Sequence, residues 1–418
     1  MLEATRPIVF ATIDHRAQHG RAFGIRASDL AARSTLVVGR TGEGKSVLLE
    51  RLILGQIERG MGVALIDPHG DLAESVLARI PRFRINDVVL FDPADRSRPV
   101  TLNLLESTLG IEPAIVVAGV LSVFRKLFAE NWGPRTEHVL RNVLFAEIAG
   151  AEPTLVGCLR LLVDEEYRVR VVARVRNAIV RQFWSKEFTA YSASFRAEVV
   201  APVQNKLSAL LTDPTIRAIV GHPRSAFSCR AVMDDGRILI ANLAKGRIGE
   251  DATRTLASML TLLVQLAAYS RADVPPKERH PFTLYADEFQ GYVTDGFTEL
   301  LAEGRKFALS AVLASQGVGA LDEQMRRTLL GNVGSLLCFR VGAEDASLLA
   351  PEFVPDLTVR DLANLGRHQL VLNHYRDGHR SFSPAVRSLE LQRRSDDPRA
   401  ADRALEADTR RPTTAVDR

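Results

Sequence analysis

The segment GRTGEGKS, residues 39–46, is the part of the sequence whose residue types and spacing point most directly to chemistry. It matches G-x-x-x-x-G-K-S, in which glycines let backbone N–H groups close around phosphate oxygens. Lys45 would place a positive charge on the β- and γ-phosphates, and the Ser46 hydroxyl can coordinate Mg²⁺. An apolar segment before it and a helical pattern after it favour a nucleotide-binding loop over an ordinary glycine-rich turn. The residues expected around the nucleotide are Gly39, Arg40, Thr41, Gly42, Glu43, Gly44, Lys45, Ser46 and Val47.

Two adjacent acids, Asp287 and Glu288, follow an apolar run in PFTLYADEFQ, residues 281–290. An acid at the end of a strand can hold Mg²⁺, and a second one can polarise an attacking water, as hydrolysis requires. Acid pairs are also common in surface turns, so this pair alone is a weak signal. The phosphate loop upstream favours a role in nucleotide hydrolysis. No guanine-reading N-K-x-D motif occurs, because NKLS at 205–208 lacks the acid. ATP and Mg²⁺ are therefore the expected ligands.

Two further polar residues end apolar runs. Gln316 ends FALSAVLASQ, and in ATPases of this layout the strand between the phosphate-loop strand and the acidic strand ends in a residue that senses the γ-phosphate. Arg340 ends GSLLCFR, and Arg305 precedes the run at 307–316. Either arginine is a candidate to complete the ATP site of a neighbouring subunit. The alternative for all three is a solvated end of a strand or helix.

Short apolar runs alternate with helical patterns at both ends of the chain, which indicates an α/β fold with a parallel sheet covered on both faces. The expected strands lie within residues 35–38, 62–71, 87–93, 237–243, 281–288, 307–316, 334–340 and 368–375. Between them, strand-like runs are scarce. The expected organisation is 1–106 and 231–390 as the two parts of an ATPase domain, 107–230 as a mostly α-helical insertion domain, and 391–418 as a flexible charged tail.

An arginine-rich stretch in the insertion could contact nucleic acid. If residues 168–186 form one helix, its apolar face consists of Val172, Val175, Ile179 and Phe183. The opposite face then carries Arg170, Arg174 and Arg181. Such a basic stripe can follow a phosphate backbone, although a solvated charged face would have the same pattern.

The composition is that of an ordinary globular protein, with 46% hydrophobic and 25% charged residues among 418. The net charge of +4 permits a nucleic-acid partner without requiring one. The 3 cysteines lie far apart, which argues against a disulfide framework or a structural zinc site. The longest apolar windows, 113–124 and 255–270, are too short or interrupted to cross a bilayer. A cytoplasmic protein is expected.

Several motifs taken in order resemble a known family. They are GRTGEGKS, LIDPHGDLAESVLARIP, VVLFDPAD, YADEFQ and AEGRKFALSAVLASQ. They resemble the FtsK/HerA class of motor ATPases, and most closely the TraG/TraD-like coupling proteins of conjugative type IV secretion. The resemblance runs over about 24–110 and 235–375. It implies a RecA-like P-loop NTPase sheet, ring hexamers, and ATP hydrolysis between subunits that drives DNA through a central pore.

The resemblance also implies roles for individual residues. Lys45 and Ser46 would hold nucleotide and Mg²⁺. Asp287 and Glu288 would coordinate the metal and polarise the attacking water. Gln316 would sense phosphate. Arg340 is a looser assignment, because the position of the arginine varies among these motors.

One departure from the family opens alternatives. Membrane-bound coupling proteins carry N-terminal transmembrane helices, and no such segment is expected here. Delivery of DNA to a secretion channel would then need a membrane-anchoring partner, which would place the protein at the inner membrane, and a relaxase partner is left open. The alternatives are a cytosolic HerA-like DNA-processing motor, a secretion ATPase that moves proteins, and a nucleotide-gated scaffold. The intact Asp287–Glu288 pair argues against the scaffold. Strand preference and direction of translocation are not encoded in any recognised motif.

Overall fold

The computed structural model describes residues 7–13, 22–98, 100–106, 110–376 and 379–388. The chain divides into two compact units. The sheet unit comprises Met1–Phe91, Ala231–Ala244 and Arg271–Arg418, and the helical unit comprises Asp92–Arg230 and Lys245–Ser270. The expected tail, 391–418, lies outside the described residues.

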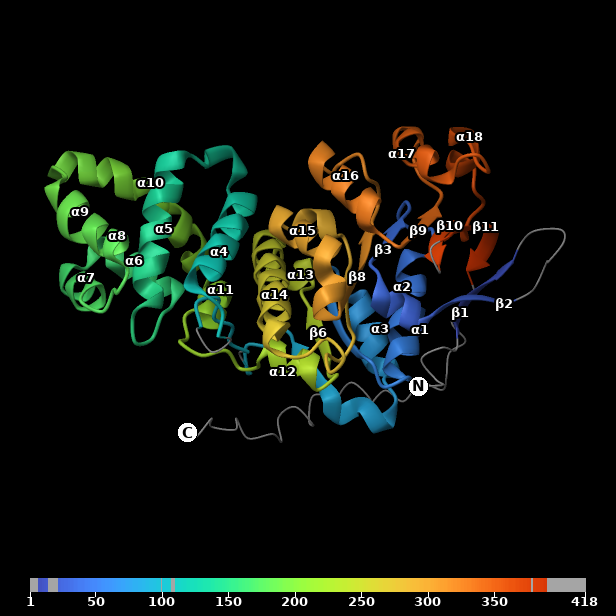
Figure 1. Ribbon diagram of the computed structural model, residues 1–418, viewed down its shortest axis with the longest axis horizontal. Helices are drawn as coiled ribbons and strands as arrows, with labels where there is room; N and C mark the ends of the chain where they lie inside the picture. Colours follow the sequence, from blue (N-terminus) through green and yellow to red (C-terminus); the bar gives the residue numbers. More distant parts are fainter. Residues whose placement is uncertain (1–6, 14–21, 99, 107–109, 377–378, 389–418) are drawn as a thin grey trace. The chain divides into compact units, whose positions relative to one another are not determined.

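The sheet unit is built on a mixed sheet whose described strands number 11, in the order β2-β1-β11-β10-β9-β3-β8-β7-β4-β6-β5 (Figure 1). All pairings from β9 to β5 are parallel. The remaining pairings, from β2 to β9, are antiparallel. The strands are β1 Pro7–Ile13, β2 Ala22–Arg26, β3 Thr35–Val38, β4 Gly62–Asp67, β5 Val88–Phe91, β6 Ile238–Asn242, β7 Phe282–Ala286, β8 Leu309–Ser315, β9 Ser335–Phe339, β10 Gln369–Arg376 and β11 His379–Ser388.

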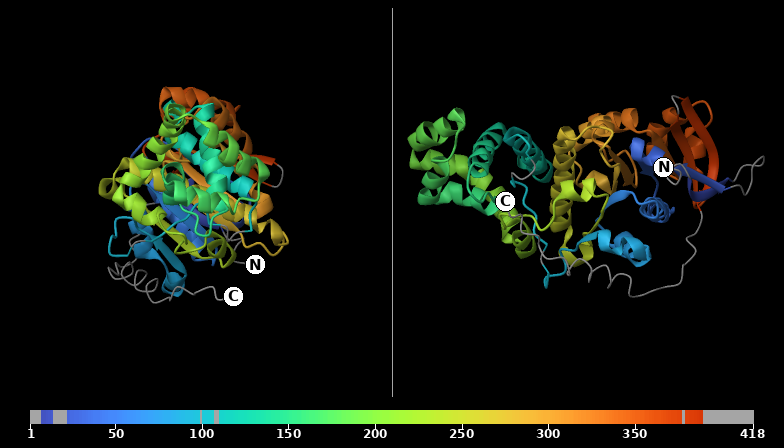
Figure 2. Two further views of the ribbon diagram at one scale, coloured as in Figure 1. Left: turned by 90° about the vertical axis from the view of Figure 1, so that its left-hand side faces the viewer. Right: turned by 60° about the horizontal axis from the view of Figure 1, so that its bottom comes forward.

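The eight strands expected from the sequence, β3 to β10, are all present, so the α/β prediction is confirmed. Every residue of the parallel strands is buried, as strands covered on both faces require. The sequence reading missed β1, β2 and β11, which form the antiparallel edge seen beside β10 in Figure 2. In β1, buried Ile8 and Phe10 alternate with exposed Val9, a half-buried pattern that is weaker than a continuous apolar run.

Helices α2, Lys45–Ile57, and α3, Asp71–Arg79, cover one face of the sheet. Their apolar side chains join one core with inward-facing residues of β1, β4 and β6. The other helices of the sheet unit are α1 Ala27–Ala32, α15 Asp295–Glu303, α16 Glu323–Asn332, α17 Ala343–Leu349 and α18 Val359–Ala363.

A buried polar network fixes α2 against the sheet. Gln56 is fully buried; its Oε1 accepts a hydrogen bond from the Tyr285 hydroxyl at 2.6 Å, and its Nε2 donates to Thr283 Oγ1 at 3.0 Å. Thr283 also bonds Ser310 of β8 at 3.1 Å. Because buried polar groups are costly unless paired, this network sets the position of α2 relative to β7 and β8.

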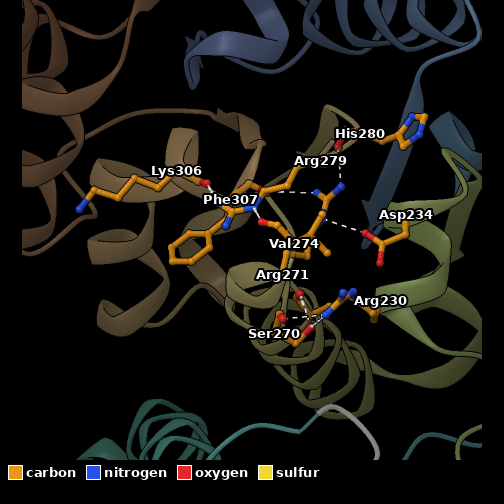
Figure 3. Close-up of polar contacts among 10 residues, drawn as sticks. Arg230, Asp234, Ser270, Arg271, Val274, Arg279, His280, Lys306 and Phe307 are labelled. Carbon is orange, nitrogen blue, oxygen red and sulfur yellow. Dashed lines mark hydrogen bonds and ion pairs between the residues drawn. The ribbon is translucent and has the colours of Figure 1, made fainter. Parts of the chain in front are cut away.

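Arg271 fixes the starting ends of the same two strands (Figure 3). Its side chain is fully buried; Nη1 donates to the carbonyl of Phe307 at 3.1 Å and Nη2 to that of His280 at 2.6 Å. Its Nε forms an ion pair with Asp234 at 2.9 Å. His280 and Phe307 precede β7 and β8, so Arg271 ties together strands whose far ends carry the candidate site residues.

The helical unit contains no strand among its described residues. Its helices are α4 Pro113–Leu127, α5 Pro134–Ile148, α6 Leu155–Val163, α7 Glu165–Val172, α8 Ala178–Gln182, a π-helix Phe183–Glu187, α9 Phe188–Ala190, α10 Ala193–Thr212, α11 Pro214–Val220, α13 Lys245–Ile248 and α14 Glu250–Ser270. Helix α12, Cys229–Asp234, spans the crossing into the sheet unit. The mostly α-helical insertion is thus confirmed as a fold feature. None of the described helices is long and apolar enough to span a membrane.

The expected single helix over 168–186 is wrong. Helix α7 ends at Val172 and α8 begins at Ala178, with Asn177 as its N-cap. The expected apolar face does not exist as a face, because Ile179 is 74% exposed. The Asn177 side chain accepts bonds from the N–H groups of Ile179 and Val180 and so starts a new helix.

Candidate nucleotide-binding and hydrolysis site

The phosphate loop joins β3 to α2 in a conformation that needs its glycines. Gly42 and Gly44 have φ angles of 80° and 110°, in the left-handed region that L-residues avoid. A Cβ atom on Gly39 would lie 2.5 Å from Cβ of Phe339. The loop is tied to strands on either side of β3, because the Gly39 N–H bonds Ser315 O at 3.2 Å and the Arg40 N–H bonds Arg340 O at 3.1 Å.

The first turn of α2 offers N–H groups to an anion. The Leu48 N–H bonds the carbonyl of Gly44, so the N–H groups of Lys45, Ser46 and Val47 precede the first intrahelical bond. The helix dipole adds partial positive charge at this end. Thr41 and Ser46 are exposed, as a loop that receives a soluble ligand requires.

Lys45 is the cation of the site. Its side chain is buried, and Nζ donates to the carbonyls of Gly39 at 2.6 Å and Arg40 at 3.3 Å. Burial lowers the pKa of Lys45, whereas the charges of Glu288, Asp287 and Glu43 act in the opposite direction. The acids at the end of β7 are therefore close enough to act on the lysine of the loop.

Asp287 lies in a cluster of carboxylates. It is 6% exposed, and burial, followed by the charges of Asp67 and Glu288, raises its pKa to about 6, while Lys45 acts to lower it. Asp67 ends the neighbouring strand β4 and accepts bonds from the N–H groups of His69 and Ala73, both at 2.9 Å. A buried carboxylate crowded by others is stabilised by a cation. With the Ser46 hydroxyl, the oxygen donors present fit Mg²⁺.

Glu288 is held by two amides. Its Oε1 accepts a bond from Gln316 Nε2 at 2.9 Å, and its Oε2 accepts one from Gln290 Nε2 at 2.6 Å. The backbone of Glu288 has φ 47°, an unusual value for a non-glycine residue. Strand β8 lies between β3 and β7, as expected, so Gln316 ends the strand between the loop and the acids.

The two candidate arginines lie at opposite ends of the parallel strands. Arg340 follows β9, and its guanidinium forms an ion pair with Glu43 of its own phosphate loop. Arg305 is exposed in the turn before β8, at the end away from the loop. The structure thus brings Arg340, but not Arg305, to the site of the same chain.

A cavity of about 590 Å³ opens beside the loop. It is lined by Arg40, Thr41, Gln316, Gly317, Gly319, Ala320, Glu344 and Asp345. The amide of Gln316 and the exposed side of the loop therefore face a common space that a ligand can enter.

Sequence reasoning missed three residues that the structure adds to the site: Asp67, Gln290 and Glu43 as an acid. Asp67 stands in DPHGD directly after an apolar run, which was a usable signal. Gln290 had no such signal, and neither did the pairing of Glu43 with Arg340, because both depend on contacts that only folding creates.

The candidate DNA contacts belong to the helical unit. Arg170, Arg174 and Arg181 are all exposed, but they belong to α7, the following turn and α8 in turn. The same unit carries an aromatic cluster in which Phe188, Tyr191 and Phe195 are in successive ring contact. Arg135 lies over Phe195, and Arg168 and Arg196 lie over Phe188.

Comparison with known proteins places this geometry. Residues 18–113 match the family described as helicase HerA, central domain. No curated protein sequence matches the chain. Among solved structures, the unbound bacterial conjugative coupling protein TrwB is similar with a TM-score of 0.66 and 19% identity, over 94% of this chain and 90% of that one. TrwB in complex with ADP and Mg²⁺ has the same TM-score at 18% identity, over 90% of each chain.

A second solved relative supports the same fold. VirB4 of Thermoanaerobacter pseudethanolicus is similar with a TM-score of 0.60 and 15% identity, over 93% of this chain and 96% of that one. The fold of TrwB and VirB4 extends over nearly the whole chain, and the HerA match covers the segment with the phosphate loop. The chain therefore carries a segment similar to the HerA central domain, within residues 18–113, and has the fold shared by TrwB and VirB4.

Proposed function

We propose that the chain is an ATP-hydrolysing DNA translocase, similar to conjugative coupling proteins, that pumps DNA through a ring of identical subunits. The observation that carries the hydrolytic part is the placement of Glu288. The charge of Glu288 acts to raise the pKa of Lys45, and its carboxylate accepts a hydrogen bond from Gln316, which supports a role for Glu288 in activating water. A protein that only binds nucleotide has no need of this arrangement.

The proposed ligand is ATP with Mg²⁺. Residues 39–47 would surround the phosphates, Lys45 would stabilise their charge, and Ser46 and Asp287 would hold the metal. When bound, Mg²⁺ neutralises charge on the phosphate oxygens. Glu288 would orient a water and accept its proton, and Gln316 would sense the γ-phosphate. Solved complexes of TrwB contain GDPNP, ADPNP, or ADP with Mg²⁺, which supports a nucleotide with Mg²⁺ as the ligand.

The proposed partner is DNA, and the proposed assembly is a hexameric ring. Residues 1–106 and 231–390 would form the ATPase domain of each subunit, and 107–230 the insertion domain. Arg170, Arg174 and Arg181 would contact the phosphate backbone from the insertion domain. The similarity to a conjugative coupling protein over nearly the whole chain supports this choice.

The direct test measures ATPase rate with and without single-stranded and duplex DNA, over a range of protein concentration. We expect stimulation by DNA and a specific activity that rises with concentration together with the ring seen by light scattering. The Glu288→Gln variant is the matched control, because it keeps the fold and loses the acid. Stimulation by protein substrates but not by DNA would favour a secretion ATPase that moves proteins. Full activity of a monomer at every dilution would overturn the ring.

A further inference from the structure

Glu43 is a buried carboxylate inside a loop built to receive phosphates. Its side chain is 4% exposed. Its Oε1 accepts bonds from Nε of Arg340, at 3.0 Å, and from Nη2 of the same guanidinium. Its Oε2 is buried and forms no hydrogen bond within the described part of the chain. The phosphate-loop pattern does not call for an acid here, so this charge needs an explanation.

An unpaired Glu43 would oppose nucleotide binding in two ways. Its negative charge would repel the phosphates, since like charges interact strongly in a partly buried site. It would also attract Lys45, on whose pKa its charge already acts. A lysine paired with Glu43 is less available to the β- and γ-phosphates.

Arg340 is placed to prevent both effects. Strand β9 lies beside β3, and its last residue, Phe339, packs where a Cβ atom of Gly39 would be. The carbonyl of Arg340 accepts the Arg40 N–H at 3.1 Å, while its side chain pairs with Glu43. Arg340 therefore both fixes the backbone of the loop and pairs with the negative charge of Glu43. His368, which precedes β10, has its Nδ1 atom 3.2 Å from the carbonyl oxygen of Glu43.

We propose that Arg340 acts within its own chain, as a positioning residue that neutralises Glu43 and keeps the loop and Lys45 open to phosphate. This inference rests on the proposed nucleotide binding and replaces the expectation that Arg340 reaches into the site of a neighbouring subunit. The two roles differ in what they control. A residue acting on its own loop sets nucleotide affinity, whereas one that completes a neighbour's site sets turnover.

Fluorescent ADP binding to the full chain tests the proposal through charge-specific rescue. We expect Arg340→Gln to weaken ADP binding at least about tenfold, because a carboxylate is left unpaired beside the phosphates. Glu43→Gln alone should stay within about threefold of wild type, and the double variant Glu43→Gln with Arg340→Gln should recover most of the loss. Arg327→Gln removes an exposed arginine of the same unit and is the matched control. Thermal unfolding of each variant verifies that it folds.

Two outcomes would overturn the proposal. One is wild-type ADP affinity in Arg340→Gln with loss of turnover only. The other is recovery of ATPase activity when Arg340→Gln subunits are mixed with Glu288→Gln subunits, because a trans-acting arginine would then meet an intact glutamate at some interfaces. We expect no recovery. Lys45→Ala separates this result from the proposed function. If Lys45→Ala also binds ADP normally, nucleotide binding at this loop fails altogether; if it abolishes binding while Arg340→Gln does not, only the role of Arg340 fails.

Discussion

Nε2 of Gln316 donates a hydrogen bond of 2.9 Å to Oε1 of Glu288, so the candidate phosphate sensor contacts the candidate water-activating acid directly. The other carboxylate oxygen is bound by Gln290, which keeps Glu288 in place from the opposite side. The Nε2 of Gln316 carries two N–H donors, so it can keep its bond to Glu288 and offer the second N–H to a phosphate oxygen. A γ-phosphate bound by the second N–H would therefore be linked through Gln316 to Glu288.

Substitutions of Lys45 and Glu288 are expected to impair different steps, nucleotide binding and hydrolysis respectively. Lys45→Ala removes the cation proposed to bind the phosphates and should weaken nucleotide binding. Glu288→Gln should still bind ATP but lose hydrolysis by about 10²–10⁴-fold, the usual contribution of a general base. Equilibrium binding and single-turnover hydrolysis measured on both variants distinguish the two effects. Near-normal turnover by Glu288→Gln would remove this residue from the mechanism.

Substitutions of Gln316 and Gln290 should impair different steps of the reaction. Gln316→Ala should reduce the preference for ATP over ADP as well as turnover, because it deletes the proposed contact to the γ-phosphate. Gln290→Ala should lower kcat by roughly tenfold with an unchanged KM, because it loosens Glu288 without touching nucleotide. Gln290→Glu places a like charge beside Glu288 and should be worse than Ala. Equal losses of ATP affinity in the Gln290 and Gln316 variants would contradict separate roles.

The exposed arginines Arg170, Arg174 and Arg181 predict an electrostatic contact with DNA. Each lost phosphate contact should reduce the slope of log affinity against log salt by about 0.9 for duplex DNA. The triple alanine variant should fold normally and keep its basal ATPase rate, because all three side chains are exposed. Arg360→Ala, an exposed arginine of the sheet unit, is the control in the same salt titration. Parallel lines of unchanged slope would show that these arginines form a solvated surface.

Glu147 predicts a pH dependence of stability in the helical unit. It is fully buried, accepts bonds from the Thr154 N–H and the Tyr167 hydroxyl, and burial raises its pKa. A carboxyl whose pKa is raised on folding stabilises below its unfolded pKa, and this stability is lost as pH rises through the folded value. Glu147→Gln keeps an acceptor without the charge, so its stability relative to wild type should increase as pH rises above the ordinary pKa of a glutamate.

Tryptophan fluorescence measures this effect selectively. The chain has 2 tryptophans, Trp132 and Trp184, and both belong to the helical unit. Their unfolding midpoint in denaturant should show the pH dependence in wild type and a flatter one in Glu147→Gln. Glu198→Gln changes an exposed glutamate of the same unit and should match wild type at every pH. An identical pH profile for Glu147→Gln and wild type would contradict a raised pKa.

The amino-acid sequence by itself determined the phosphate loop and the parallel strands. The loop is readable because Gly42, Gly44, Lys45 and Ser46 act through neighbouring backbone and need no distant partner. The parallel strands are readable because burial on both faces demands continuous apolar runs. The antiparallel edge was not readable: β1 pairs with β11, and its alternating pattern has meaning only once that partner is in place.

Tertiary structure alone decided how the charges of the site are arranged. Glu43 and Arg340 are 297 positions apart, and their pairing depends on β9 lying beside β3, an order that residue spacing does not encode. Asp67 joins Asp287 for the same reason, through the adjacency of β4 and β7. In the helical unit, helical periodicity predicted one helix where the Asn177 side chain starts a second one. Consecutive residues determine the local structure of the phosphate loop, whereas long-range contacts follow from strand order and packing.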